Sequence, residues 1–139
     1  MLFLVPFIGW LCSGIIKYCV NTIRHGANAK HMVGNGGFPS THTTVAVSTT
    51  AAIGFSSGVN TEMFALGVAF SFIVILDATG IRRALGDHAR NLNEINTSTG
   101  SQLNRKHRES QGHTRLEVLG GIFVGIVVGW IASVLLNNI

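Results

Sequence analysis

The stretch VLGGIFVGIVVGWIASVLL, residues 118–136, carries no charged side chain and decides the fold class. Its length is close to the ~20 apolar residues that a helix needs to cross a bilayer. Only 12% of the chain is charged, against about 25% in typical soluble domains, and the mean hydropathy is +0.41. The sequence therefore predicts a chain that lies in a membrane.

Three further runs of similar length carry at most one charge each: residues 1–20, 43–59 and 63–81. The second of these is rich in Thr, Ser and Gly, so its bounds are the least certain. The first has neither the basic start nor the small-residue cleavage site of a secretory signal, and we expect it to stay as a helix. We predict an all-α, integral membrane bundle of about four transmembrane helices, in a single domain over residues 1–139.

The basic residues give the orientation. Every Lys and Arg lies in residues 21–42 or 82–115, except Lys17 at the end of the first helix. Four helices place both loops on one side, which the positive-inside rule makes the cytoplasm. We expect a multi-pass protein of the plasma (inner) membrane, with both termini outside. Basic residues divided between two loops do not form one nucleic-acid-sized surface, so no nucleic-acid partner is expected.

Small residues recur every four positions in two of the predicted helices, as Gly121, Gly125 and Gly129 and as Gly67 and Ser71. This spacing lets helices approach closely in lipid. It predicts a tight bundle and allows a homodimer through the same faces.

Residues 81–95 place their apolar side chains on one helical face and most of their charges elsewhere. This pattern is typical of an amphipathic helix at the membrane interface. The polar stretch 96–104 that follows is expected to be a flexible linker.

The polar groups of the chain are expected to meet at the cytoplasmic ends of the helices. Residues 39–42 (PSTH) and 112–117 (GHTRLE) each precede an apolar run, and Asp77 closes another. Helix N-termini present free N–H groups and a positive dipole end, which favour an anion. Nearby cations suit a phosphate or a similar oxyanion, and they are Lys17, Arg24, Arg82, Arg83, Arg108 and Arg115.

His113 and Glu117 are four residues apart, so a helix containing both would stack them on one face. The carboxylate could then hold the Nδ1 proton and leave Nε2 free to attack, while His42 protonates a leaving oxygen. A structural explanation is also open, because Thr114-x-x-Glu117 before an apolar run is a capping box.

The other polar residues also have structural interpretations. Ser40 is a good N-cap. Asp77 is an ionisable group inside a membrane segment, which favours a functional role, and it could pair with Arg82 or Arg83. The remaining histidines have no metal-ligand spacing, so we expect no metal and no cofactor. A metal-dependent hydrolase using His42, Asp77, His113 and Glu117 is the less favoured alternative.

Taken in order, Lys17-x6-Arg24, Pro39-Ser40-Thr41-His42 and His113-x3-Glu117 resemble the three motifs of the type 2 phosphatidic acid phosphatase and vanadium haloperoxidase superfamily. The chain is most similar to the divergent branch of that superfamily, which is described as acid phosphatase/vanadium-dependent haloperoxidase-related. The segments that carry this likeness are GGFPSTHT, DATGIRR and GHTRLEV.

The resemblance implies a lipid phosphatase or polyprenyl pyrophosphatase that works without a metal. His113 would be the nucleophile that forms a phosphohistidine, Glu117 would orient it, and His42 would be the general acid. Phosphate oxygens would be held by Ser40, Thr41 and nearby amides, and their charge neutralised by Lys17 and Arg24.

Several positions depart from the superfamily pattern, including Glu117, which stands in place of the usual Asp, and the Ser-Arg pair of the third motif, which is missing. His25 stands where the first motif has proline, Thr41 where the second has glycine, and His107 where the third has arginine. Arg108, Arg82 or Arg83 could supply the missing charge. The alternative function is a non-catalytic membrane protein for anion binding or transport that retains the phosphate pocket.

Overall fold

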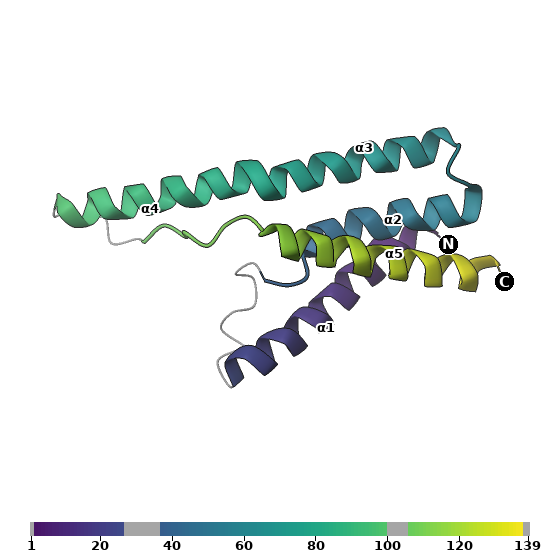
Figure 1. The fold of residues 1–139 in the computed structure, drawn as a ribbon, viewed down its shortest axis with the longest axis horizontal. Coiled ribbons are helices and arrows are strands. Elements are labelled where there is room, and N and C mark those ends of the chain that lie inside the picture. Colours follow the sequence, from purple (N-terminus) through teal and green to yellow (C-terminus); the bar gives the residue numbers. More distant parts are fainter. Residues whose placement is uncertain (1, 27–36, 100–105, 138–139) are drawn as a thin grey trace.

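The computed structural model describes residues 2–26, 37–99 and 106–137. Its helical elements, drawn in Figure 1, are η1 (Leu2–Leu4), α1 (Val5–His25), α2 (Thr41–Ser57), α3 (Glu62–Leu76), the π-helical turn η3 (Asp77–Ile81), α4 (Arg82–Ser98) and α5 (Arg115–Asn137). The predicted all-helical fold is confirmed.

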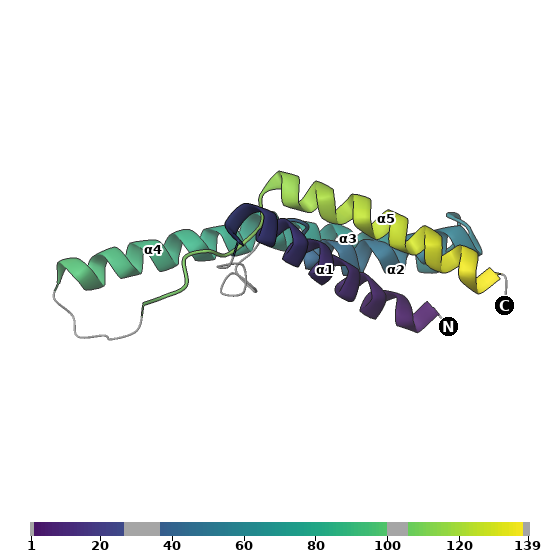
Figure 2. The same cartoon turned by 90° about the horizontal axis from the view of Figure 1, so that it is seen from below.

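The chain crosses the bundle four times in alternating directions. Helices α1 and α3 end, and α2 and α5 begin, at the same end of the bundle, while the N and C ends lie together at the other (Figures 1 and 2). The helix ends that flank the two basic loops therefore lie at one end of the bundle, as the sequence predicted. Helix ends that carry the candidate site residues are brought together by this topology.

Helix α2 is the centre of the bundle and contacts α1, α3 and α5. A glycine on each neighbour allows the close approach. A Cβ added at Gly9 of α1 would lie 2.5 Å from the Ser48 hydroxyl, and one at Gly67 of α3 would lie 2.9 Å from the Thr50 hydroxyl. The predicted small-residue faces therefore pack against α2.

The glycines of α5 make similarly close contacts, here with backbone atoms of α2 and of its N-cap. A Cβ at Gly121 would lie 2.7 Å from the Ser40 carbonyl oxygen, and one at Gly129 would lie 2.7 Å from the Ser48 carbonyl oxygen. The stripe on α5 is thus used inside the chain. A homodimer stays a prediction, which a single chain does not test.

The buried hydroxyl groups of α2 find partners within the helix and its N-cap. Thr44 Oγ1 donates to the Ser40 carbonyl at 2.9 Å, and Thr50 Oγ1 donates to the Ala46 carbonyl at 2.9 Å. Such bonds to the preceding turn remove the cost of burying a hydroxyl. This explains how a helix rich in Thr and Ser occupies the core.

Three helices are long and apolar enough to cross a membrane among the described residues, and they cover Leu2–Arg24, Glu62–Ser98 and Arg115–Leu135. The α2 helix, with 17 residues, is shorter and is enclosed by the others. Large apolar side chains such as Phe7, Leu66 and Phe123 point outward. This surface matches lipid as the surrounding solvent, and the chain has the architecture of a membrane protein.

The predicted amphipathic helix is α4, and it differs from the expectation in how it is connected. It continues the axis of α3 through the π-helical turn, so that the two form one rod that extends beyond the bundle (Figures 1 and 2). The helix includes residues 96–98, where a linker was expected, and residues 100–105 lie outside the described part of the chain. Its buried residues are Gly86 and Ala89, whereas Leu85 and Leu92 are exposed.

Candidate active site

A polar pocket of about 260 Å³ lies between α1, the first turn of α2, the start of α4 and the segment that leads into α5. It is lined by Lys17, Thr41, His42, Arg82, Arg108, Ser110, Gln111, Gly112 and His113. The pocket thus joins residues from all three predicted motifs. The sequence prediction that these motifs converge at one end of the bundle is confirmed.

His113 reaches the pocket at the end of an extended segment that returns along α4. Asn93 of α4 holds this segment, because its side chain donates to the His107 carbonyl at 2.9 Å and accepts from the His107 N–H at 2.8 Å. At the near end, the His113 N–H donates to the Ala78 carbonyl of the π-turn at 2.9 Å. The main chain of His113 is therefore fixed from a second element.

Gly112 is required immediately before this histidine. Its φ of +80° lies in the left-handed region, and a Cβ there would lie 2.8 Å from the Arg83 backbone nitrogen. Any larger residue would be strained and would push the segment away from α4. The glycine therefore sets the path that delivers His113.

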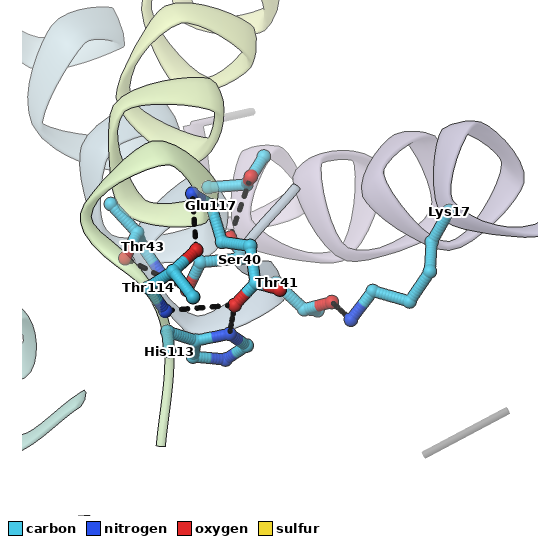
Figure 3. A network of polar contacts seen from close by, with 8 residues as sticks. Lys17, Ser40, Thr41, Thr43, His113, Thr114 and Glu117 are labelled. Carbon is cyan, nitrogen blue, oxygen red and sulfur yellow. Dashed lines mark hydrogen bonds and ion pairs between the residues drawn. The ribbon is translucent and has the colours of Figure 1, made fainter. Parts of the chain in front are cut away.

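His113 and Glu117 form the predicted pair. The His113 Nδ1 atom lies 3.0 Å from Glu117 Oε2, and the histidine side chain is only 8% exposed (Figure 3). The contact leaves Nε2 as the ring nitrogen available to a ligand.

The same carboxylate also caps α5. Glu117 Oε2 accepts from the Thr114 N–H at 3.0 Å, and the Glu117 N–H donates to Thr114 Oγ1 at 3.3 Å (Figure 3). This is the reciprocal pattern of a capping box. The catalytic and structural interpretations of Glu117 are therefore compatible, since one oxygen serves both contacts.

Ser40 has a structural place. Its side chain is fully buried and caps α2, with Oγ accepting from the Thr43 N–H at 3.4 Å and from Thr43 Oγ1 at 2.9 Å. The Ser40 N–H donates to the Glu117 carbonyl at 2.8 Å, which ties the start of α2 to the first turn of α5. Ser40 does not line the polar pocket, and its predicted contact with phosphate remains untested.

Lys17 enters the pocket from α1. Its Nζ donates to Thr41 Oγ1 at 3.2 Å, as Figure 3 shows. Thr41 is the first residue of α2, so the ammonium group lies beside the positive end of that helix. Two positive features at one point favour an anion between them.

His42 faces His113 across the pocket. The ring centroids are 6.4 Å apart and the rings are tilted by 58°. Burial, together with the nearby Arg82, His113 and Lys17, holds the pKa of His42 below its usual value, and Asp77 opposes this effect. His42 lies outside the three long apolar helices, and a bound oxyanion would favour its charged form.

Asp77 forms an ion pair with Arg82 across the π-turn. Both side chains are about a third or more exposed, at 34% and 45%, so the pair contributes little to stability. Its effect is to orient the guanidinium, since Arg82 lines the pocket and Asp77 does not. The predicted pairing of Asp77 with one of the two arginines is found with Arg82.

The remaining predicted cations have different places. Arg108 lines the pocket, whereas Arg24 and Arg83 do not. Arg24 is exposed on the last turn of α1, and Arg83 packs against Gly112. Of the three arginines proposed to replace the missing charge of the third motif, Arg82 and Arg108 are the two that reach the pocket.

Several residues that form or support the pocket were not predicted from the sequence. Ser110 and Gln111 line the pocket, and Asn93 and the Ala78 carbonyl hold the segment that carries His113. Ser110 and Gln111 directly precede the predicted segment 112–117, and this proximity was the available signal for them. No sequence pattern pairs Asn93 with His107, because the contact joins distant positions.

Within the described ranges 2–26, 37–99 and 106–137, no three His, Cys, Asp or Glu side chains form a group that could hold a metal ion. The chemistry that the pocket offers is that of two histidines, one carboxylate and several cations.

The fold and pocket define a class: helical membrane proteins with a histidine pair and a cation-lined pocket at one end of the bundle. Residues 1–128 match the divergent PAP2 family, and the chain belongs to that family. It is 27% identical over 107 residues to "Uncharacterized membrane protein YuiD" of Bacillus subtilis (strain 168), covering 67% of this chain and 68% of that protein. No solved structure matches the chain.

Proposed function

We propose that this protein is a membrane phosphatase that hydrolyses lipid phosphates or polyprenyl pyrophosphates at the cytoplasmic face of the plasma (inner) membrane. The observation that carries the proposal is the His113–Glu117 contact, which leaves Nε2 opposite His42 in a pocket lined by Lys17 and Arg82. Support also comes from membership of a family related to phosphatases.

The first chemical step would form a phosphohistidine. Nε2 of His113 attacks phosphorus, the bond from phosphorus to the ester oxygen breaks, and its electron pair stays on that oxygen. Protonated His42 gives its proton to the leaving oxygen. Glu117 accepts the hydrogen bond from Nδ1–H and stabilises the charged ring.

The second step would regenerate the site. Water gives a proton to the now neutral His42 as its oxygen attacks phosphorus, and the bond between phosphorus and Nε2 breaks to release inorganic phosphate. Lys17, Arg82 and Arg108 neutralise charge on the phosphoryl oxygens in both steps. They need little reorganisation, because Thr41 and Asp77 already hold the first two.

A phosphorylated lipid suits the position of the pocket. It lies at the end of the bundle where the apolar helices α1, α3 and α5 meet the two basic loops. Lipid head groups are found at this depth. The positive-inside rule places this end in the cytoplasm.

A non-catalytic anion-binding or transport protein is the second candidate. One observation favours it: Glu117 is accounted for by its capping contacts with Thr114, without any catalytic role. Such a protein would bind vanadate or phosphate in the pocket without turnover.

The first experiment measures phosphate release from a panel of lipid phosphates and polyprenyl pyrophosphates, with chelator present and the protein in detergent. We expect His113→Ala to lower kcat by about 10³-fold or more, and His42→Ala by about 10²-fold or more. His107→Ala is the matched control, because His107 uses only its main chain in its contacts with Asn93. An unchanged rate of phosphate release in His113→Ala would contradict the proposal.

Glu117→Gln separates the two roles of that residue. Glutamine can take the same place in a capping box, so the melting temperature should stay within about 2 °C of wild type. The charge that supports the His113 ring is lost, and kcat should fall by about 10²-fold or more. Equal activity in Glu117→Gln and wild type would assign Glu117 to capping alone.

A further inference from the structure

A second cavity adjoins the polar pocket and has a different character. It is a groove of about 500 Å³ with largely apolar walls. Its lining on α1 includes Trp10, Leu11, Gly14, Ile15 and Tyr18, and its polar lining residues are Lys17, Asn21 and Thr41. Its volume is within the range of ligand sites, about 300–1,000 Å³.

The groove and the polar pocket share two residues, Lys17 and Thr41. The Lys17 side chain suits the boundary between the two cavities, because its methylene stem is apolar and its ammonium group donates to Thr41. A ligand that extends through both cavities would have an anionic head at Lys17 and an apolar tail beyond it.

The direction of the groove fits a lipid tail. Trp10 and Lys17 are seven residues apart on α1, which corresponds to about 10 Å along the helix axis. The groove therefore extends from the head-group end toward the middle of a hydrocarbon core about 30 Å thick. This length stays within one leaflet, which is about 15 Å of that core.

Gly14 keeps the groove open. A Cβ added there would have no heavy atom within 4 Å, in contrast to the tight glycines that face α2. Close helix packing therefore does not require a glycine at this position. Its absent side chain leaves space in the groove wall.

We propose that this α1 groove binds one hydrocarbon chain of the lipid whose phosphate lies in the polar pocket, so that the substrate is a lipid phosphate taken from one leaflet. This inference rests on the proposed function for the identity of the head group. The occupant is anchored by its charge at Lys17, and a lipid without a terminal phosphate would have no such anchor.

Fluorescence quenching of Trp10 tests the proposal without requiring catalysis. The chain has two tryptophans, so Trp130→Phe leaves Trp10 as the single reporter, and His113→Ala prevents consumption of the lipid. The protein is placed in phosphatidylcholine nanodiscs with a small fraction of phosphatidic acid brominated on its acyl chains. Brominated phosphatidylcholine at the same fraction is the reference lipid.

We expect brominated phosphatidic acid to quench Trp10 at a fraction at least about tenfold lower than brominated phosphatidylcholine does. Gly14→Phe should abolish this preference, because a Cβ at this position meets no heavy atom within 4 Å and the ring beyond it would occupy the groove. Val68→Phe is the matched control, since Val68 lines a different apolar groove that does not include Lys17. It should keep the preference.

Three results would overturn the proposal. Equal quenching by both lipids means that bulk lipid alone occupies the groove. No quenching by either means that something else, such as a second copy of the chain, covers it. A preference that survives Gly14→Phe means that the tail lies elsewhere.

A kinetic measurement on the chain with His113 intact separates this proposal from the proposed function. Gly14→Phe should lower kcat/KM for a long-chain lipid phosphate by about tenfold and leave a short-chain, water-soluble phosphate ester unchanged. Absence of hydrolysis in wild type would contradict the phosphatase, whereas selective quenching of Trp10 would still establish the groove.

Discussion

Helices α2 and α3 lie side by side and have similar lengths, 17 and 15 residues, but opposite relations to their surroundings. The buried positions of α2 are hydroxyl residues and alanines, whereas α3 is made largely of Phe, Leu, Ile and Val and buries only Ser71. Lipid tails are as apolar as a leucine side chain, so an apolar side chain gains no hydrophobic free energy when it moves from lipid into the bundle. Residues are therefore buried between the helices because they are small and allow close packing.

The largest effect is expected where the close approach to α2 is blocked. A side chain at Gly129 would meet the Ser48 carbonyl oxygen at 2.7 Å and the Ala52 nitrogen at 2.8 Å, and backbone atoms cannot move aside. Gly129→Leu should lower the free energy of unfolding by about 3 kcal/mol. Unfolding by SDS in mixed micelles measures this.

The control for that substitution is Val127→Leu, on an exposed position of the same helix. It should change the free energy of unfolding by less than about 0.5 kcal/mol. Equal effects at the two positions would show that α5 does not distinguish the α2 side from the lipid side.

The next effect concerns the first turn of α2, where His42 lies at the polar pocket. The pKa of His42 is lowered by burial and by Arg82, His113 and Lys17, with Asp77 opposing. A bound dianion raises the pKa again. Between these two pKa values binding takes up a proton, so affinity should fall by up to about tenfold per pH unit as the pH rises.

Sulfate is a suitable probe, because it stays a dianion from pH 5.5 to 8 and any change in affinity then belongs to the protein. Calorimetry of sulfate binding in detergent should show the fall for wild type and a flatter profile for His42→Gln. An identical pH profile in the variant would remove His42 from the anion site.

A smaller effect is expected from the hydroxyl contact between the two helices. Thr50 Oγ1 and Ser71 Oγ are 3.0 Å apart, and Thr50 also donates to the Ala46 carbonyl. Ser71→Ala therefore leaves the Thr50 hydroxyl with a partner. The free energy of unfolding in SDS should fall by only about 0.6 kcal/mol, and a loss above about 2 kcal/mol would show that hydroxyls hold the helices together.

The smallest effect is expected on the outer face of α3. Ile73 is 63% exposed, so Ile73→Leu exchanges one lipid contact for another. The same SDS measurement should show a change within about 0.5 kcal/mol. A large loss would mean that protein, rather than lipid, covers this face.

The apolar runs predicted three helices well, because length and hydropathy alone determine what can span a bilayer. For α2, the run 43–59 was predicted and the helix is Thr41–Ser57. The shift arises from the capping of α2 by Ser40. A local capping contact thus moved the helix start to Thr41, ahead of the apolar run.

The candidate site was predictable where its parts are close in sequence. The contact of His113 with Glu117 follows from helical spacing, and the convergence of His42, Arg82 and His113 follows from topology. The Ala78 carbonyl could not be predicted, since it depends on a π-helical turn that no residue pattern announced. The roles of these residues in binding and catalysis stay predictions.

The π-turn between α3 and α4 contains one more residue than an α-helical turn would. Its closing bond, from the Arg82 N–H to the Asp77 carbonyl, encloses one residue more than an α-helical turn. A π-turn covers about the same rotation as an α-turn but with one residue more, so it takes up the extra residue without turning the helix that follows. Deleting Gly80, which is exposed, would therefore restore an α-turn and leave Leu85, Gly86 and Leu92 of α4 on their present faces, so the extra residue acts only within this one turn.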